Sequence, residues 1–206
     1  MITVIDIDLG NISSVGNALR HLGIPYAVSG DPDAVVSADQ LILPGVGNFS
    51  EAMKRLEGIG MADVIRRRVL QDGVPILGIC LGMQLLAARG EEGGHSRGLG
   101  LIEGTVSLLP LEDSALPLPH VGWNEVHYDD NFTLFDSIPD GACFYFVHSY
   151  AMVPAEPVEK AYSDYGVQFV AAVRKNGIVG VQFHPEKSQI VGLALLRNFF
   201  KDHCHA

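Results

Sequence analysis

The feature that most constrains this chain is the glycine-flanked segment Gly78-Ile79-Cys80-Leu81-Gly82. It follows an apolar run at residues 74–79 and opens a helical pattern at residues 81–89. A cysteine at such a junction has the form of a nucleophile elbow, a sharp strained turn that lifts the reactive atom out of the end of a sheet. The flanking glycines remove the Cβ atoms that would clash as strand and helix approach. The alternative is a cysteine that is merely buried between the two elements.

Composition limits what can be built around this elbow. The chain has 206 residues, enough for one sizeable core and few for two, so we expect one domain over residues 1–206. A net charge of −10 disfavours nucleic acid as a partner, because no basic excess is present to meet phosphates. No apolar run reaches the length of a membrane span, and Met1–Asp6 lacks the basic start of a signal peptide.

The three cysteines, Cys80, Cys143 and Cys204, are an odd number and lack the spacing of a metal site. Reduced thiols in a cytoplasm are the simplest interpretation, and we expect neither a structural metal nor a disulfide framework.

The first ninety residues alternate apolar strands with helices, which is typical of a parallel sheet covered on both faces. The second half has shorter strands joined mostly by hairpins, including an Asn-Gly turn at residues 176–177. We therefore expect an α/β fold, a flavodoxin-like mixed sheet with a parallel core, an antiparallel extension and helices on both faces. The expected strands are 2–8, 25–28, 39–44, 74–79, 99–109, 123–128, 142–150, 169–173 and 178–183, and the expected helices are 11–21, 50–56, 62–70, 81–89 and 189–201, the last capped by Ser188.

A second informative segment is Phe183-His184-Pro185-Glu186. Residues two apart on an extended segment project to the same side, so His184 and Glu186 can serve one site. The proline biases His184 toward an extended conformation. A neutral imidazole can take a thiol proton while a carboxylate fixes its tautomer, which is the logic of a catalytic triad with Cys80 as nucleophile. Taken singly, His184 is better interpreted as a packed core histidine and Glu186 as a surface carboxylate.

A third segment, Pro44-Gly45-Val46-Gly47, follows a predicted parallel strand, where open α/β sheets place their sites. Glycines there allow unusual φ angles and can turn N–H groups toward a ligand. Together with the N–H of Leu81, this loop is a candidate oxyanion hole. The alternative is a plain tight turn.

These three segments, in this order and spacing, resemble the signatures of the class I, triad-type glutamine amidotransferases. Within that superfamily the chain is similar to the glutaminase subunits of imidazole glycerol phosphate synthase along essentially its whole length. The segments that carry this narrower resemblance are Gly98–Ile102, Pro119-His120-Val121-Gly122-Trp123-Asn124, Tyr145-Phe146-Val147-His148-Ser149-Tyr150 and Glu186-Lys187-Ser188.

The resemblance implies that Cys80 attacks the side-chain amide of L-glutamine, that His184 is the base and that Glu186 orients it. Glutamate would be released by hydrolysis of a thioester, without a cofactor, and ammonia would pass to a (β/α)8-barrel cyclase subunit. The oxyanion would be held by Gly47 and Leu81, and the glutamine by Gly45, Gln84, Ser149 and Tyr150. The partner would face Asn11, Pro119, His120 and Trp123.

Two positions depart from the family pattern. Ile7-Asp8 stands where a Tyr-Gly pair is usual, which puts the contact at that point in doubt, and Leu118 replaces a basic residue. An ion pair with the partner at Leu118 is therefore not expected. Two other functions stay open from sequence: a glutaminase serving another pathway, such as anthranilate or GMP formation, and an inactive binding module of the same fold.

Overall fold

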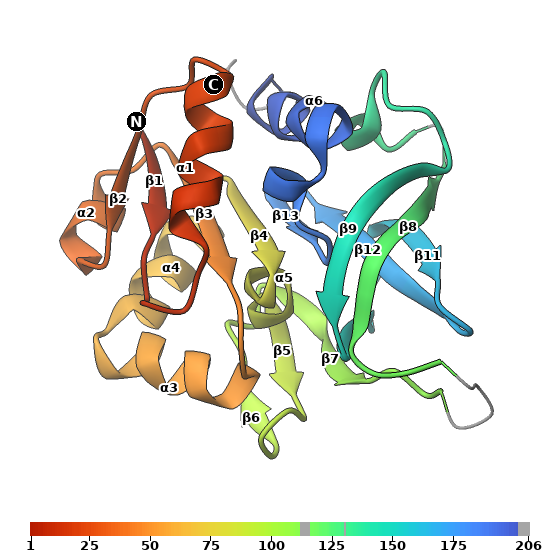
Figure 1. Ribbon diagram of the computed structural model, residues 1–206. Coiled ribbons are helices and arrows are strands. Elements are labelled where there is room, and N and C mark those ends of the chain that lie inside the picture. The colour runs from red at the N-terminus through yellow and green to blue at the C-terminus, as the bar shows by residue number, and fades with distance from the viewer. Residues whose placement is uncertain (112–115, 130, 202–206) are drawn as a thin grey trace.

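The structure is a computed structural model that describes residues 1–111, 116–129 and 131–201 (Figure 1). Cys204 lies outside the described residues. The first half of the chain forms the α/β unit that its patterning predicts. Its elements are β1 (Ile2–Ile5), α1 (Ile12–His21), β2 (Tyr26–Ser29), α2 (Pro32–Val36), β3 (Gln40–Gly45), α3 (Phe49–Gly58), α4 (Met61–Leu70), β4 (Ile76–Cys80) and α5 (Leu81–Leu85).

The first three helices begin where capping side chains are available. Asn48 accepts a hydrogen bond from the backbone N–H of Glu51 at 3.1 Å and starts α3. The short helix α2 is absent from the sequence prediction. Asp31 caps it by accepting from the N–H of Asp33 at 3.0 Å, and Pro32 occupies its first turn. The Asp-Pro pair was the available signal for this helix.

In the second half, antiparallel strands extend the sheet. Among the described residues the large sheet has nine strands in the order β2-β1-β3-β4-β13-β12-β11-β8-β9. The first five strands in this order, from β2 to β13, pair in parallel. The remaining pairs, from β13–β12 to β8–β9, are antiparallel, as expected. The further elements are β7 (Ile102–Leu108), β8 (His120–Tyr128), η1 (Thr133–Phe135), β9 (Ala142–His148), β11 (Glu159–Asp164), β12 (Gln168–Lys175), β13 (Ile178–Val181), η2 (Pro185–Lys187) and α6 (Gln189–Lys201).

A second sheet, in the order β10-β7-β5-β6 among the described residues, corrects two predictions. The helix expected over residues 81–89 ends at Leu85, and β5 (Ala87–Gly90) pairs in parallel with β7 and antiparallel with β6 (Ser96–Arg97). The strand expected over residues 142–150 is two strands, because the chain leaves the large sheet after His148 and enters the small one as β10 (Tyr150–Pro154).

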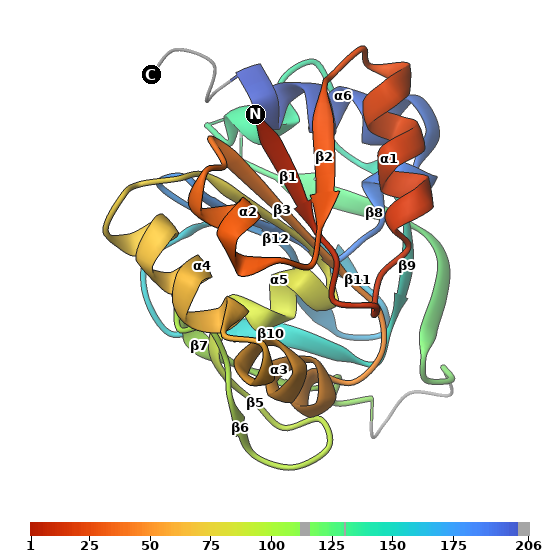
Figure 2. The same cartoon turned by 90° about the vertical axis from the view of Figure 1, so that its left-hand side faces the viewer.

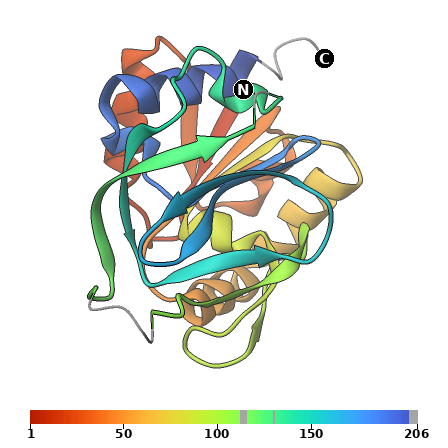
Figure 3. The ribbon, with the colours of Figure 1, turned by 90° about the vertical axis from the view of Figure 1, so that its right-hand side faces the viewer.

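Helices lie on both faces of the large sheet (Figure 2), and a cluster of buried hydrophobic side chains fills each side. Helices α1 and α6 pack on one face, where Leu19, Leu195 and Phe199 are fully buried. Helices α2 to α5 and the small sheet pack on the other, around Phe49 and Met83. Figure 3 shows the antiparallel end of the large sheet from the other side, where β9 still packs against α6. Because β3, β4 and β13 are parallel neighbours, their carboxyl ends meet at one edge.

The turn from β4 into α5 is possible only with glycine on both sides of Cys80. A Cβ atom on Gly82 would lie 1.7 Å from the carbonyl oxygen of Leu43 in β3. A Cβ atom on Gly78 would lie 2.6 Å from the carbonyl oxygen of Gly82. Both obstacles are backbone atoms, which cannot rotate aside. The glycines of the elbow therefore set how closely helix, turn and neighbouring strand pack.

The substitution Gly82→Ala is expected to lower the free energy of unfolding by at least about 3 kcal/mol, because its methyl group overlaps the backbone of β3. The matched control is Gly58→Ala at the end of α3, where an added Cβ meets nothing within 4 Å. Because alanine favours a helix over glycine, the control is expected to be neutral or stabilising by up to about 1 kcal/mol. Urea unfolding measures both; equal stabilities would show that the close approach does not exist.

Candidate functional site

Cys80 occupies a strained backbone position at the carboxyl end of β4. Its φ is 55° and its ψ is −110°, a region that residues with a side chain rarely adopt. It pairs with Gly45 of β3 in the parallel register, and only 5% of its surface is exposed. The Sγ atom lies 3.7 Å from the carbonyl oxygen of Val147. The predicted elbow is thus present, and its thiol faces the edge where β3 and β4 end.

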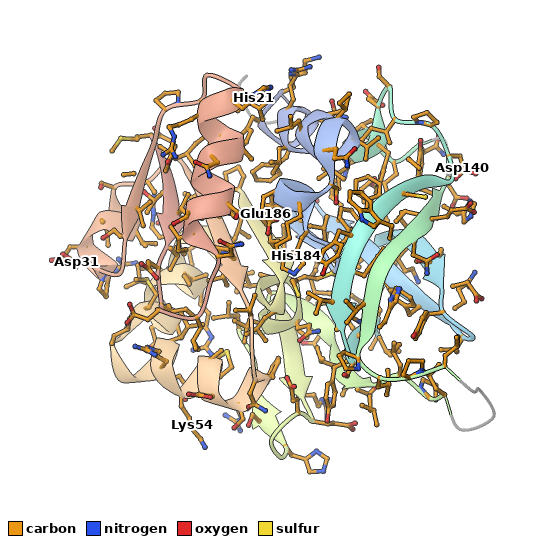
Figure 4. All side chains as sticks on the ribbon, in the orientation of Figure 1. His21, Asp31, Lys54, Asp140, His184 and Glu186 are labelled. Atoms are coloured by element: carbon orange, nitrogen blue, oxygen red, sulfur yellow. The ribbon has the colours of Figure 1, made fainter. Side chains whose placement is uncertain are left out.

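His184 and Glu186 lie beside this turn because β13, which leads to them, is the parallel neighbour of β4. His184 has the extended conformation that Pro185 predicts, with φ −102° and ψ 94°. Its Nδ1 atom lies 2.8 Å from Oε1 of Glu186, and the two side chains are 2% and 1% exposed (Figure 4). The segment is not extended throughout, because Pro185–Lys187 forms a single 3-10 turn that brings the carboxylate back to the imidazole.

Ser188 fixes this turn, a role that the sequence analysis missed. Its hydroxyl donates to the carbonyl oxygen of His184 at 2.7 Å and accepts from the N–H of Tyr145 at 3.0 Å. The hydroxyl that was expected to cap the last helix is therefore committed to holding the His184–Glu186 segment against β9. No local sequence pattern indicates this role, because it depends on the burial of Ser188 beside β9.

The protonated form of His184 is strongly favoured. Burial lowers its pKa, but the sulfur of Cys80 and the carboxylate of Glu186 outweigh that effect and raise the pKa to about 9. The Nε2 atom, on the side away from Glu186, is buried and has no hydrogen-bond partner among the described residues. A cationic imidazole beside a cysteine sulfur is the arrangement that activates cysteine nucleophiles.

A cavity of about 290 Å³ opens onto Cys80. Six residues predicted to act on glutamine line it: Gly47, Cys80, Leu81, Gln84, Ser149 and Tyr150. Gly45 lies behind this wall rather than in it, against Leu81 and Gly82. A volume of this size suits one small ligand such as an amino acid.

The polar groups of this cavity suit an amino-acid side-chain amide. Gln84, which is 4% exposed, donates through Nε2 to the carbonyl oxygen of Tyr150 at 2.9 Å. Glu92 also lines the cavity and holds its place by accepting from the N–H of Phe49 at 2.9 Å. Glu92 supplies the negative charge that an α-ammonium group requires. Sequence reasoning passed over it, since it stands in a segment interpreted only as a loop.

The candidate oxyanion loop is held in a particular conformation. Gly47 has a φ of 106°, which favours glycine, although an added Cβ would meet nothing within 4 Å. The N–H of the preceding residue, Val46, donates to the carbonyl oxygen of Leu9 at 2.6 Å. This N–H is therefore directed at the β1–α1 loop and is not free to stabilise charge above Cys80.

The four residues expected to face a partner are placed differently from one another. Asn11 caps α1 by accepting from the N–H of Ser14 at 3.4 Å, and Pro119 reaches the cavity. Trp123 is 49% exposed on β8. His120 is only 2% exposed and turns inward, so its side chain is not presented on the surface.

Of the two departures noted in the sequence, the one at Asp8 has a local explanation. The carboxylate of Asp8 forms an ion pair with Arg55 of α3 at 2.5 Å, so its charge is matched within the chain. Leu118 is 36% exposed, so an apolar side chain reaches the surface at that position.

Among residues 1–111, 116–129 and 131–201, no three His, Cys, Asp or Glu side chains are grouped in a way that would hold a metal ion. In the same residues no helix is both long enough and apolar enough to cross a membrane.

Comparison with known proteins decides the family. The model for "Glutamine amidotransferase class-I" matches residues 3–203. This chain belongs to the class I glutamine amidotransferases. Its relatives include proteins named imidazole glycerol phosphate synthase subunit HisH, from Moorella thermoacetica, 46% identical over 96% of this chain and 93% of that protein, and from Geobacillus thermodenitrificans, 47% identical over 97% and 94%.

Solved structures of this family share the fold. A putative GMP synthase protein from Thermoplasma acidophilum superimposes with a TM-score of 0.75 over 98% of this amidotransferase and 92% of that chain, at 21% identity. A glutamine amidotransferase from Thermotoga maritima does so with a TM-score of 0.69 over 100% and 97%, at 16% identity. The expected flavodoxin-like α/β fold is confirmed.

The raised pKa of His184 makes stability depend on pH. Between about pH 6.5 and 9 the folded protein binds a proton that the unfolded chain releases, so this contribution is complete below pH 6.5 and is lost as the pH rises through 9. The substitution Glu186→Gln removes one of the anions responsible. We expect it to destabilise the protein by about 1–3 kcal/mol at pH 6 and by much less at pH 9.5.

The control for this prediction is Glu125→Gln, which removes an exposed carboxylate 3.6 Å from the exposed His127. Urea unfolding at several pH values is expected to show a pH-dependent difference only for the buried pair. A difference for Glu186→Gln that stays constant from pH 6 to 9.5 would contradict the ion-pair account.

Proposed function

We propose that this amidotransferase is the glutaminase subunit of imidazole glycerol phosphate synthase, which acts in histidine biosynthesis. One observation carries the proposal: a single cavity joins Cys80 at a strained elbow to the amide of Gln84 and the carboxylate of Glu92. The near full-length relatives named HisH favour this pathway over anthranilate or GMP formation. The buried His184–Glu186 pair behind Cys80 disfavours an inactive binding module.

In this reaction the thiol proton of Cys80 passes to Nε2 of His184, which becomes the imidazolium that its raised pKa favours, while Glu186 accepts the Nδ1–H. The sulfur of Cys80 then attacks the side-chain carbonyl carbon of glutamine. The Nε2 atom is available for this exchange, because it has no other hydrogen-bond partner among the described residues. The tetrahedral intermediate collapses when His184 returns its proton to the departing nitrogen, which leaves as ammonia, and a glutamyl thioester remains. Water, deprotonated by His184, releases glutamate and regenerates the thiol.

The substrate is held by groups on three sides of the cavity. The carboxylate of Glu92 receives the α-ammonium group of glutamine, and Gln84 with the Ser149–Tyr150 backbone positions the rest of the molecule. The N–H groups of Gly47 and Leu81 stabilise the oxyanion. In this proposal residues 1–206 form a single amidotransferase domain, and the reaction uses no cofactor.

Ammonia passes to a separate (β/α)8-barrel cyclase subunit in the cytoplasm, and the two proteins form a heterodimer with lyase activity. The exposed side chains of Val121 and Trp123, 56% and 49% exposed, supply an apolar surface near Pro119 at the cavity. Asn11 lies at the start of α1 on the same edge. The inward-turned His120 contributes to this surface through its backbone.

The position of the oxyanion loop links activity to the partner. The N–H of Val46, the residue before Gly47, donates to the carbonyl oxygen of Leu9, so the loop is tied to the β1–α1 loop and this N–H is not available as a further oxyanion donor. Docking of the cyclase near the β1–α1 loop is the event that would release this bond. The resting protein is therefore a glutaminase with an incomplete oxyanion hole.

The substitution Cys80→Ala is expected to abolish glutamine hydrolysis while leaving ammonia-dependent synthesis by the complex intact, because only the nucleophile is removed. Cys143→Ala, which changes an exposed thiol away from the cavity, is the matched control and is expected to keep both activities. Glutamate release and product formation are measured with the cyclase present. Continued hydrolysis by Cys80→Ala would refute the nucleophile assignment.

The isolated protein is expected to hydrolyse glutamine at least about 100-fold more slowly than the complex with the cyclase and its nucleotide ligand, the size of effect that a missing oxyanion donor produces. A coupled glutamate assay with and without the barrel subunit measures the ratio. High activity of the isolated chain would contradict gating by the partner.

A further inference from the structure

Three buried polar side chains near the cavity have no part in the reaction steps above. Gln182 is fully buried, and His120 and His148 are 2% and 6% exposed. Burying such groups is unfavourable unless each finds hydrogen-bond partners, so their partners indicate what they hold in place. All three prove to be bonded to one another or to groups of the cavity.

Gln182 connects the glutamine-binding amide to the nucleophile. Its Oε1 accepts from Nε2 of Gln84 at 3.1 Å, and its Nε2 donates to Sγ of Cys80 at 3.8 Å. The same Nε2 of Gln84 also donates to the carbonyl oxygen of Tyr150. Turning either amide over would bring oxygen against oxygen or N–H against N–H, so each has one allowed orientation. The Oε1 atom of Gln84 is thereby directed away from these partners.

The two histidines fix the other side of the Tyr150 carbonyl. Nδ1 of His148 lies 2.9 Å from that oxygen and must be the donor, because a carbonyl only accepts. Nε2 of a neutral His148 is then an acceptor, so Nδ1 of His120, 3.1 Å away, donates to it. Burial lowers the pKa of each histidine to about 4, which keeps both neutral near pH 7.

Aromatic rings hold His120 at the start of this arrangement. Phe146 stacks on one side with ring centroids 5.0 Å apart, and Tyr165 stacks on the other at 4.0 Å. The imidazole therefore has little freedom to leave His148. It lies in β8, directly between Pro119 at the cavity and the exposed Val121.

We propose that Gln182, His148 and His120 are positioning residues, linked in one hydrogen-bonded chain that fixes the Gln84 amide and the Cys80 thiol relative to each other. The chain runs from His120 through His148 to the Tyr150 carbonyl, where Gln84 also donates, and from Gln84 through Gln182 to the sulfur. The inference rests on the proposed glutaminase function only for its effect on turnover. Its two ends act on different steps: Gln182 on the thiol, and the histidines on glutamine binding.

The thiol end is tested by alkylation of Cys80 with iodoacetamide as a function of pH, read by mass spectrometry of the Cys80 peptide in the full chain. Gln182→Met removes an N–H donor to the thiolate and is expected to move the alkylation midpoint upward by about one to two pH units. Gln168→Met, on the exposed side of β12, is the matched control and is expected to leave the midpoint unchanged. Gln182→Leu is a second uncharged variant without the N–H donor, so it tests the same shift if the methionine variant fails to fold.

The histidine end is tested by steady-state kinetics of the complex with the cyclase. His120→Leu is expected to raise KM for glutamine about five- to tenfold with little change in kcat and no change in the alkylation midpoint. His120→Asn retains an N–H donor near the Nδ1 position and is expected to restore most of the lost affinity. His127→Leu, at an exposed histidine, is the control.

Identical alkylation profiles for Gln182→Met, Gln182→Leu and Gln168→Met would contradict the hydrogen bond from Gln182 to the thiol. Equal KM values for His120→Leu and His127→Leu would contradict the role of the two histidines in glutamine binding. The alkylation assay needs no glutamine turnover. A shifted alkylation profile in a protein without glutaminase activity would therefore refute the proposed function but still support the hydrogen-bonded arrangement.

Discussion

The contact between Gly82 and the carbonyl oxygen of Leu43 is the constraint on which the rest of the site depends. It lets α5 begin directly against β3, since the space there is too small for any side chain. That closeness forces the turn at Cys80 into its positive φ and aims the thiol at the edge where the parallel strands end. Strain of this kind persists only when the surroundings fix the backbone, as the two buried hydrophobic clusters do here.

Sheet topology then brings the remaining groups to that thiol. After β4 the chain forms the antiparallel strands, and β13 then pairs in parallel with β4. Residues about a hundred positions apart in the sequence therefore lie at the same edge of the sheet. The switch of the chain from β9 to β10 at Ser149 places the Tyr150 carbonyl on the opposite wall. The proposed nucleophile, its base and the proposed binding amide are thus set by backbone pairing, and side chains such as Ser188 make the final adjustments.

The parts that could be predicted from sequence are those with local causes. Apolar runs between helical patterns predicted the parallel strands, and the spacing of Gly78, Cys80 and Gly82 predicted the elbow. The small sheet could not be predicted, because Ala87–Gly90 becomes a strand only through pairing with β7. His120 was placed on the surface by resemblance alone, whereas its burial depends on stacking with Tyr165, which no local pattern encodes.

The most direct test of the account is the intact mass of the protein after acid quenching during glutamine turnover with the cyclase present. A nucleophilic Cys80 predicts a fraction of chains heavier by one glutamyl group, with the adduct on the Cys80 peptide and labile to hydroxylamine, as a thioester is. The absence of any adduct under turnover, or its location at Cys143, would contradict the claim that the strained elbow carries the reacting sulfur.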